Sequence, residues 1–184
     1  MPPDSPCAST DTRIYLIRHP AVAVQDRCYG QSDVALAEPV DRLALRLQQK
    51  LPAEFTLLSS PLSRCRLLAE ALGTPRLDPR LMEINFGAWE MRCWDSIERS
   101  QIDAWAEDTL GFAGHGGESV LQMAERAIAA LQEALADTHG PLVIVSHGGP
   151  LRALQGHLQG LPASAWSRLT FSLGELRIVP RPPG

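Results

Sequence analysis

An arginine and a histidine stand side by side at Arg18 and His19, and together they could hold and attack a phosphoryl group. A guanidinium binds phosphate oxygens through paired N–H donors, and imidazole is one of the side chains that form covalent intermediates. Both residues directly follow the apolar run Ile14–Ile17, which is typical of a buried strand in a parallel sheet. Taken alone, the pair fits a strand that ends in polar residues at a surface turn equally well.

Two further basic side chains follow apolar runs in the same way. Phe55–Leu58 leads into a predicted helix whose first turn contains Arg64, and Pro141–Ser146 leads directly into His147. In open α/β sheets, ligands bind beyond the carboxyl ends of the strands, which share one edge when the strands are parallel. We therefore expect both side chains to converge with the first arginine–histidine pair.

An acid on the segment Leu81–Glu90 could protonate the leaving group of such a reaction. Glu83 and Glu90 lie there among two aromatic residues and a glycine, a composition typical of an ordered loop. Aromatic neighbours raise the pKa of a carboxyl group by desolvation, which is the condition for a general acid. Glu90 also fits a surface acid that points to solvent. Two arginines, two histidines and one acid together meet the requirements of phosphoryl transfer.

The elements that must position these residues alternate along the chain. Short apolar runs predict strands at 14–17, 55–58, 74–78, 141–146 and 174–179, and apolar periodicity predicts helices that begin near 39, 61, 93, 119 and 150. A strand–helix alternation of this kind predicts a mostly parallel sheet covered by helices on both faces. The last strand is expected at a sheet edge. We expect a single domain over 1–184, with 1–11 as a loose tail.

Composition excludes several classes of function. The chain has 184 residues and a net charge of −4, so neither nucleic acid nor an anionic membrane is an expected partner. No apolar run is long enough to span a bilayer, and the N-terminus lacks the apolar core of a secretory signal. The four cysteines show no zinc-ligand spacing, which favours reduced packing cysteines in a cytoplasmic protein. Lys50 is the only lysine among 17 lysine and arginine residues, so the abundance of arginine reflects compositional bias and does not by itself indicate phosphate binding.

Five segments together resemble those of the histidine phosphatase superfamily, whose fold is phosphoglycerate-mutase-like. They are Arg-His-Pro at 18–20, Ser-Ser-Pro-Leu-x-Arg at 59–64, Leu-x-Glu-x-x-Phe-Gly-x-Trp-Glu at 81–90, Gly-Gly-Glu-Ser at 116–119 and Ser-His-Gly-Gly at 146–149. Each segment alone is a weak signal, whereas all five in this order are a strong one. The resemblance covers nearly the whole chain, from Arg13 to Val179, and implies a three-layer α/β/α sandwich with a mostly parallel central sheet.

The resemblance also implies roles for individual residues. His19 would be the nucleophile that becomes a phosphohistidine, and Glu83 would be the proton donor and acceptor. Arg18, Arg64 and His147 would hold the phosphoryl oxygens, with further donors from Gly148 and the backbone beyond it. We expect neither a metal nor another cofactor, because the arginines already supply the positive charge.

The sequence departs from the usual pattern of this superfamily at several places, and these places concern the substrate. Pro20 replaces a glycine and removes a backbone N–H. The Arg-His-Pro start, the segment Cys-Tyr-Gly-x-x-Asp at 28–33 and the short length look most like bacterial alpha-ribazole phosphatases of cobalamin synthesis. Tyr29, Gly30 and Gln31 are candidate substrate-binding residues, and Trp89 is expected on the pocket wall because an aromatic ring suits a flat substrate.

The expected partner is therefore a small phosphate ester, either a nucleoside-like or a sugar phosphate. Two alternatives remain: a phosphoglycerate mutase or another small-molecule phosphatase of the same superfamily, and an inactive scaffold that only binds phosphorylated partners. The sequence leaves the oligomeric state open and is compatible with a homodimer.

Overall fold

A five-stranded sheet with the order β3-β2-β4-β1-β5 forms the centre of the molecule. The computed structural model describes residues 12–182, so the predicted loose tail at 1–11 lies outside the described residues. The strands are β1 (Ile14–Arg18), β2 (Thr56–Ser59), β3 (Arg76–Leu77), β4 (Leu142–Ser146) and β5 (Leu176–Val179). The first four strands are parallel. Strand β5 lies at one edge, where the last strand is expected, and pairs with β1 in the antiparallel direction.

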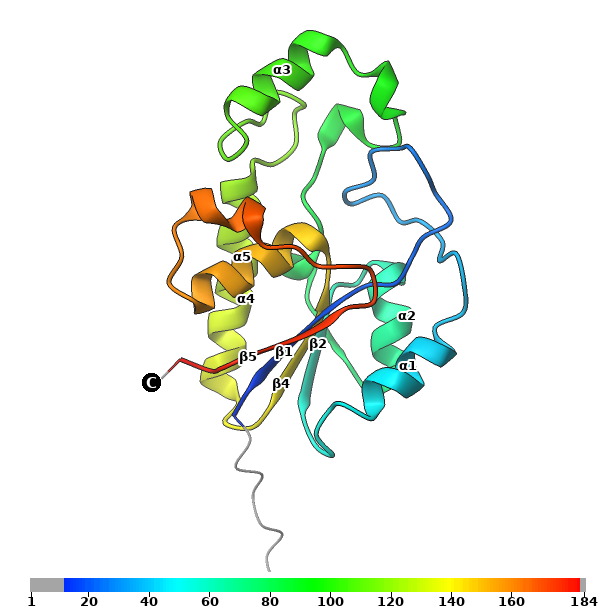
Figure 1. Ribbon diagram of the computed structural model, residues 1–184, viewed down its shortest axis with the longest axis vertical. Coiled ribbons are helices and arrows are strands. Elements are labelled where there is room, and N and C mark those ends of the chain that lie inside the picture. The colour runs from blue at the N-terminus through cyan, green and yellow to red at the C-terminus, as the bar shows by residue number, and fades with distance from the viewer. Residues whose placement is uncertain (1–11, 183–184) are drawn as a thin grey trace, which may run out of the picture.

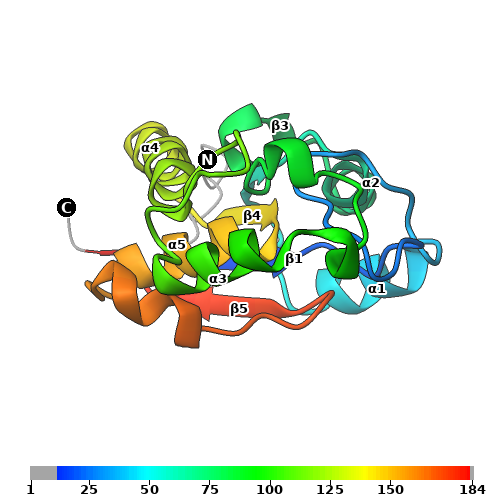
Figure 2. The same cartoon turned by 90° about the horizontal axis from the view of Figure 1, so that it is seen from above.

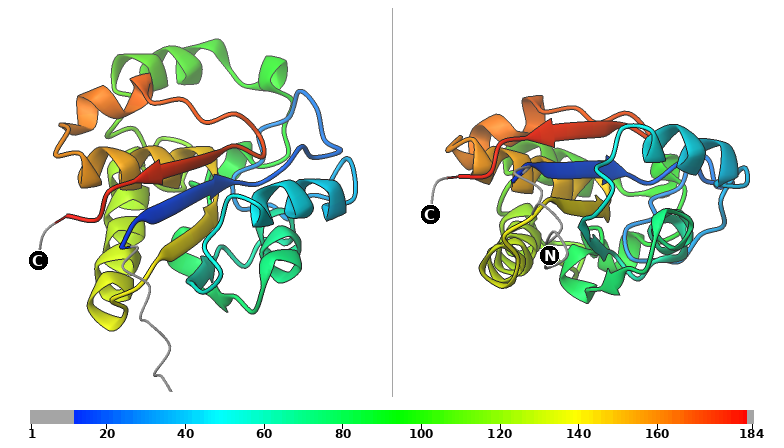
Figure 3. Two further views of the ribbon diagram at one scale, coloured as in Figure 1. Left: turned by 60° about the horizontal axis from the view of Figure 1, so that its bottom comes forward. Right: turned by 90° about the horizontal axis from the view of Figure 1, so that it is seen from below.

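Helices cover both faces of this sheet (Figures 1 and 2). They are α1 (Asp41–Gln48), α2 (Ser63–Leu72), α3 (Arg99–Glu107), α4 (Val120–Asp137) and α5 (Gly148–Leu158), with 3₁₀ turns at Pro79–Leu81, Gly87–Trp89, Trp94–Ser96 and Ala163–Arg168. Helices α1 and α2 lie on one side of the sheet, and α4 and α5 lie on the other (Figure 3). This arrangement confirms the predicted α/β/α sandwich. In the part of the chain that the structure describes, no helix is long and apolar enough to cross a membrane.

Alternation along the buried strands divides the core between the two faces. Ile14 and Leu16 of β1 pack with the apolar residues of α4 and α5, whereas Tyr15 and Ile17 pack with those of α1 and α2. Successive side chains of a strand point to opposite faces, so a strand buried on both sides must be apolar at every position. The predicted continuous apolar run is thus explained by two separate cores.

Local sequence determines some helix ends, and distant contacts determine others. Helix α4 begins with the predicted capping box, in which the Ser119 hydroxyl accepts from the Gln122 N–H at 3.2 Å. Helix α2 begins at Ser63 instead of the predicted Pro61. The Asp33 carboxylate, 30 residues earlier in the chain, accepts the backbone N–H of Ser63 at 2.9 Å and its hydroxyl at 2.7 Å. A tertiary contact therefore supplies the helix with its N-terminal acceptor.

The predicted helix over 93–110 is wrong as a single element. The chain forms a 3₁₀ turn at Trp94–Ser96, leaves helical geometry at Ile97, and then forms α3. No residue of α3 is buried, and Figure 1 shows the helix beyond the end of the sheet, at the top of the view. We call the segment 86–117, which includes α3, the cap. Aromatic residues of the cap pack with one another and with Cys28 in a third cluster, separate from the two cores of the sheet.

Candidate active site

The carboxyl ends of β1 and β4 bring the two histidines together. In the register of these strands Arg18 lies opposite Ser146, so His19 and His147 follow at neighbouring positions. The backbone N–H of His19 donates to the Ser146 carbonyl at 3.0 Å, and the two imidazole rings lie 5.2 Å apart between centroids. Parallel pairing therefore places two residues that are 128 positions apart at one sheet edge, as the strand-end argument predicts.

His19 is buried, and its ring is held in one tautomer. Its Nδ1 lies 2.7 Å from the Pro20 carbonyl oxygen, and because a carbonyl can only accept, Nδ1 carries the hydrogen. The Nε2 lone pair is therefore free to attack. The pKa of His19 is lowered to about 4, mainly by burial and also by the positive charges of Arg64 and Arg18, while the hydrogen bond to Pro20 acts in the opposite direction. The side chain is thus neutral near pH 7, as a nucleophile requires.

His147 is fully buried and has a partner at each ring nitrogen. The Nε of Arg64 donates to its Nδ1 at 3.2 Å, which leaves Nε2 protonated and directed at the Ser60 hydroxyl at 2.8 Å. Burial, followed by the charge of Arg64, holds the pKa of His147 well below its ordinary value. His147 is therefore a neutral donor at Nε2. This N–H can donate to a phosphoryl oxygen of a bound substrate in place of the Ser60 hydroxyl.

The two arginines differ in how many of their donors are already used. Arg64 is fully buried, and it donates to the carbonyls of Gly30 at 2.6 Å and Ser32 at 2.9 Å in addition to His147. Arg18 donates to the Phe171 carbonyl at 2.5 Å, whereas its Nε is buried without a partner. A buried N–H donor without an acceptor is costly, and an anion bound beside His19 would satisfy it.

Glu83 lies at the N-terminus of α5. One carboxylate oxygen accepts the N–H of Ile84 at 3.0 Å, and the other accepts the N–H of Gly149 at 3.2 Å. A Cβ atom at position 149 would come within 2.3 Å of this carboxylate, so a larger residue there would displace the Glu83 side chain. A carboxylate at a helix N-terminus is stabilised by the unpaired N–H groups there. The structure therefore holds Glu83 at the same edge as the two histidines.

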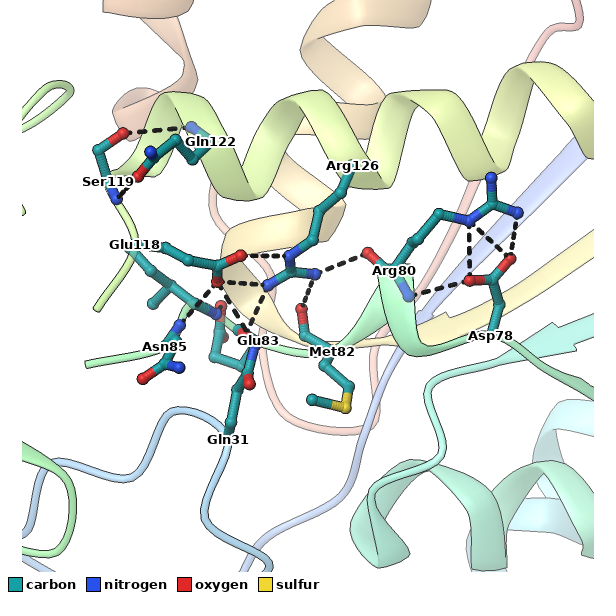
Figure 4. Close-up of polar contacts among 11 residues, drawn as sticks. Gln31, Asp78, Arg80, Met82, Glu83, Asn85, Glu118, Ser119, Gln122 and Arg126 are labelled. Atoms are coloured by element: carbon teal, nitrogen blue, oxygen red, sulfur yellow. Dashed lines mark hydrogen bonds and ion pairs between the residues drawn. The ribbon is translucent and has the colours of Figure 1, made fainter. Parts of the chain in front are cut away.

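Arg126 of α4 fixes the backbone around this acid (Figure 4). Its guanidinium donates to three carbonyls of the loop that carries Glu83, those of Arg80 at 2.7 Å, Met82 at 2.7 Å and Glu83 at 2.8 Å. It also donates to both carboxylate oxygens of Glu118, at 2.7 Å and 2.8 Å. The start of the same loop is held by the Ser146 hydroxyl, which donates to the Leu81 carbonyl at 2.7 Å. The acid is thus positioned from both α4 and β4.

Several residues predicted to touch substrate have other contacts. Gln31 uses its side-chain amide on the Glu83 carbonyl at 3.1 Å and on the Glu118 carboxylate at 3.4 Å, so it supports the acid loop. Tyr29 remains at the site, with the Arg64 guanidinium carbon 5.5 Å from its ring centroid. Gly148 lies against the Arg18 side chain, where an added Cβ would sit 3.5 Å from the guanidinium carbon.

Trp89 lies outside the pocket wall. It is 0% exposed, its ring packs in the cap 5.0 Å from that of His115, and its Nε1–H donates to Gln101 at 2.9 Å. The expectation that Trp89 lines the pocket is therefore wrong for this conformation, because no atom of the side chain is accessible. Trp89 and His115 stabilise the cap that carries the neighbouring loop residues.

Glu90 does not point to solvent, contrary to the sequence interpretation. It is half-buried and accepts hydrogen bonds from Gly30, Gln31, Ser32 and Phe86. The sequence analysis also missed Arg126 and Ser60. Arg126 lies on a helix that the sequence marks by its apolar stripe, and the signal for it is Glu118 in the Gly-Gly-Glu-Ser segment, an acid that needs a basic partner. Within residues 12–182, no group of three or more His, Cys, Asp or Glu could hold a metal ion.

A fold with a parallel sheet and a histidine pair beside two arginines defines a class of phosphoryl-transfer enzymes. Residues 14–183 match the histidine phosphatase superfamily (branch 1), and the chain belongs to this superfamily. It is an enzyme of the phosphatase and phosphoglycerate-mutase type.

The chain is similar to several individual members of this superfamily. The chain is 35% identical to a probable phosphoglycerate mutase GpmB of Erwinia tasmaniensis, over 85% of this chain and 79% of the relative. A mycobacterial glucosyl-3-phosphoglycerate phosphatase has a similar structure, with a TM-score of 0.78 and 29% sequence identity, over 91% of this chain and 92% of the other. A phosphoglycerate mutase from Thermus thermophilus gives a TM-score of 0.71 at 30% identity over 91% and 92%.

Proposed function

We propose that this chain is a phosphomonoesterase that works through a phosphohistidine at His19. The observation that carries the proposal is the state of this ring: it is neutral and buried, and its Nδ1 hydrogen is committed to Pro20. Its Nε2 can therefore attack without prior loss of a proton. Arg18 and Arg64 supply positive charge close to this ring, as phosphoryl transfer requires.

We propose the following steps, in which Glu83 begins in its protonated form. Nε2 of His19 bonds to phosphorus as the bond from phosphorus to the alcohol oxygen breaks, and Glu83 gives its proton to that oxygen. Water then attacks phosphorus, Glu83 takes a proton from the water, and the bond from phosphorus to Nε2 breaks. Inorganic phosphate leaves, and both side chains return to their starting states. Arg18, Arg64 and His147 hold the phosphoryl oxygens throughout.

For the substrate we propose alpha-ribazole 5'-phosphate first. The Arg-His-Pro start and the Cys-Tyr-Gly-x-x-Asp segment support it, and Tyr29 beside Arg64 offers a ring against which a flat base can pack. Burial of Trp89 removes one argument that the sequence suggested. A phosphoglycerate-type ester is the second candidate, because one similar protein is named a probable phosphoglycerate mutase and one similar structure is that of a glucosyl-3-phosphoglycerate phosphatase. A cytoplasmic location, the absence of nucleic-acid and membrane partners, and a homodimer remain predictions from the sequence.

A panel of phosphate esters tests this proposal. Phosphate release would be measured from alpha-ribazole 5'-phosphate, from 3-phosphoglycerate and from glucosyl-3-phosphoglycerate, with isomerisation of phosphoglycerates followed in parallel. We expect kcat/KM to be highest for the first ester. Efficient isomerisation without release of phosphate would identify a mutase instead. Binding of phosphate without turnover of any ester, including a nitrophenyl phosphate, would identify the inactive scaffold.

A further inference from the structure

The carboxylate of Glu90 collects an unusual number of backbone donors from one short segment. Gly30 and Ser32 each donate a backbone N–H to Oε2 at 3.0 Å, and Gln31 donates to Oε1 at 2.9 Å. The Ser32 hydroxyl adds a bond of 2.6 Å, and the N–H of Phe86 adds one of 3.0 Å from the cap. Three consecutive peptide N–H groups therefore point at a single side chain.

The opposite side of the same segment faces Arg64. The carbonyls of Gly30 and Ser32 accept from the two terminal nitrogens of the guanidinium, at 2.6 Å and 2.9 Å. The segment 30–32 thus lies between an anion at its N–H groups and a cation at its carbonyls. Charge-assisted hydrogen bonds of this kind are shorter and stronger than neutral ones, and each ion favours the same orientation of the segment.

Close packing leaves this segment little freedom. A Cβ atom at position 30 would approach the Ile84 carbonyl to 2.0 Å and the Glu90 carboxylate to 2.5 Å. Gly30 is therefore required by the approach of the backbone to the acid loop, a role that needs no contact with substrate. A shift of the segment away from Glu90 would move both carbonyl acceptors of Arg64.

From these contacts we propose that Glu90 is a positioning residue that aims the Arg64 guanidinium at the phosphoryl group through segment 30–32. The proposal rests on the proposed function only in naming phosphate as the ligand of Arg64. Arg64 in turn donates to His147 at 3.2 Å, so its orientation also affects the second histidine. Glu90 itself touches none of the reacting atoms, and its effect is expected in phosphate binding.

Glu90 is suited to this role because it stays ionised. Burial by itself would raise the pKa of Glu90, but the hydrogen bonds from Ser32, Gln31 and Phe86 outweigh burial and leave the pKa below its ordinary value. A glutamine at this position would present an NH₂ group to N–H donors that need an acceptor. Glu90→Gln therefore changes the charge and the hydrogen bonds while it keeps the size of the side chain.

The test is the dissociation constant of inorganic phosphate, measured by titration calorimetry on the full chain. Glu90→Gln should weaken phosphate binding about tenfold or more, the usual effect of losing a hydrogen bond to a charged group. KM for nitrophenyl phosphate should rise by the same factor. The control Glu107→Gln, an exposed acid on α3, should leave both values unchanged.

A double-mutant cycle separates positioning from general loosening of the structure. In an Arg64→Met background, Glu90→Gln should change phosphate affinity little further, because its effect runs through Arg64. An equal loss in both backgrounds, or an unchanged dissociation constant in a folded Glu90→Gln protein, would overturn the proposal. Ser32→Ala removes one hydrogen bond to Glu90 and should also weaken phosphate binding, by a smaller factor. If Glu90→Gln fails to fold, this variant decides the test, and an unchanged phosphate affinity in Ser32→Ala would overturn the proposal. Weakened binding in a chain without turnover would uphold this proposal and refute the proposed function.

Discussion

The phosphate-holding side and the leaving-group side of the site are built from different parts of the molecule. His19 and His147 follow adjacent buried strands, and Arg64 stands on the first turn of α2 against the same edge. Glu83 instead lies on an irregular loop, which Arg126 holds by three of its carbonyls (Figure 4).

Both sides use a carboxylate to fix a loop, but the fixed groups differ. Glu90 binds the N–H groups of segment 30–32 and thereby orients a cation, whereas Glu118 binds Arg126 and the N–H of Asn85 and thereby orients an acid. The comparison indicates that phosphate affinity and acid assistance depend on different networks, which meet at Gln31: its backbone N–H binds Glu90, and its side-chain amide binds the Glu83 carbonyl and Glu118. The two properties should therefore be separable by substitution.

Removal of the nucleophile should give the largest loss. His19→Ala should lower turnover by at least about 10⁴-fold, the scale observed when a catalytic nucleophile is deleted. Labelled substrate quenched during turnover should leave an acid-labile, alkali-stable phosphate on His19 in the native chain and none in the variant. His157→Ala, on the exposed face of α5, is the control. A label on a serine or an aspartate would refute the assignment.

Loss of the acid should depend on the leaving group. General acid catalysis contributes about 10²–10⁴-fold, and it matters most for a poor leaving group such as a sugar alcohol. Glu83→Gln should therefore slow an alkyl phosphate by this factor and a nitrophenyl phosphate much less, with an unchanged dissociation constant for inorganic phosphate. An equal loss with both substrates would mean that Glu83 positions phosphate, and the distinction between the two sides would fail.

Arg126→Met should affect the leaving-group side and the stability of the fold together. The guanidinium is partly buried and its loss leaves three loop carbonyls and the Glu118 carboxylate without their partner. We expect the free energy of unfolding to fall by about 2–3 kcal/mol, measured by urea denaturation. The preference for nitrophenyl over alkyl phosphate should increase as in Glu83→Gln. A rise in the phosphate dissociation constant as large as that of Glu90→Gln would contradict the separation.

Acidification should lower the free energy of unfolding through His19, a residue of the phosphate-holding side. The pKa of His19 is about 4 in the folded chain against 6.5 ordinarily, so between these values the unfolded state binds more protons and stability falls as pH falls. His19 alone should cost about 2 kcal/mol at pH 5 relative to pH 7. Unfolding midpoints measured across this range should show a shallower slope in His19→Asn. An identical slope would mean that other groups carry the acid sensitivity.

Chelation should have no effect on either side. The arginines supply the charge that a cation would otherwise bring, and the described residues offer no cluster of metal ligands. Turnover of nitrophenyl phosphate should survive exhaustive treatment with a chelator, measured before and after dialysis. Loss of activity that added magnesium or zinc restores would overturn the mechanism on both sides at once.

The sequence by itself determined the mostly parallel sheet, the helices on both of its faces and the edge at which the basic residues meet. The reason is physical: apolar runs and their period are local properties, and parallel strands end at one edge whatever lies between them. The structure brings His19, Arg64 and His147 together at this edge, as their positions after three apolar runs predicted. The capping box at Ser119 could be predicted for the same reason, because both of its partners lie within one turn.

Only the tertiary structure decided what surrounds these residues. Glu90 looked like a surface acid because four of its five donors come from segment 30–32, which lies 58 to 60 residues away in the chain. Trp89 looked accessible because its burial depends on how the cap folds, with Trp105, Phe112 and His115 packed against its ring. The start of α2 depends on Asp33, and the hold of Arg126 on the acid loop depends on carbonyls 43 to 46 residues away. Hydrogen bonds between a side chain and distant backbone groups leave no pattern of spacing in the sequence, so the fold had to bring the partners together before either network could be recognised.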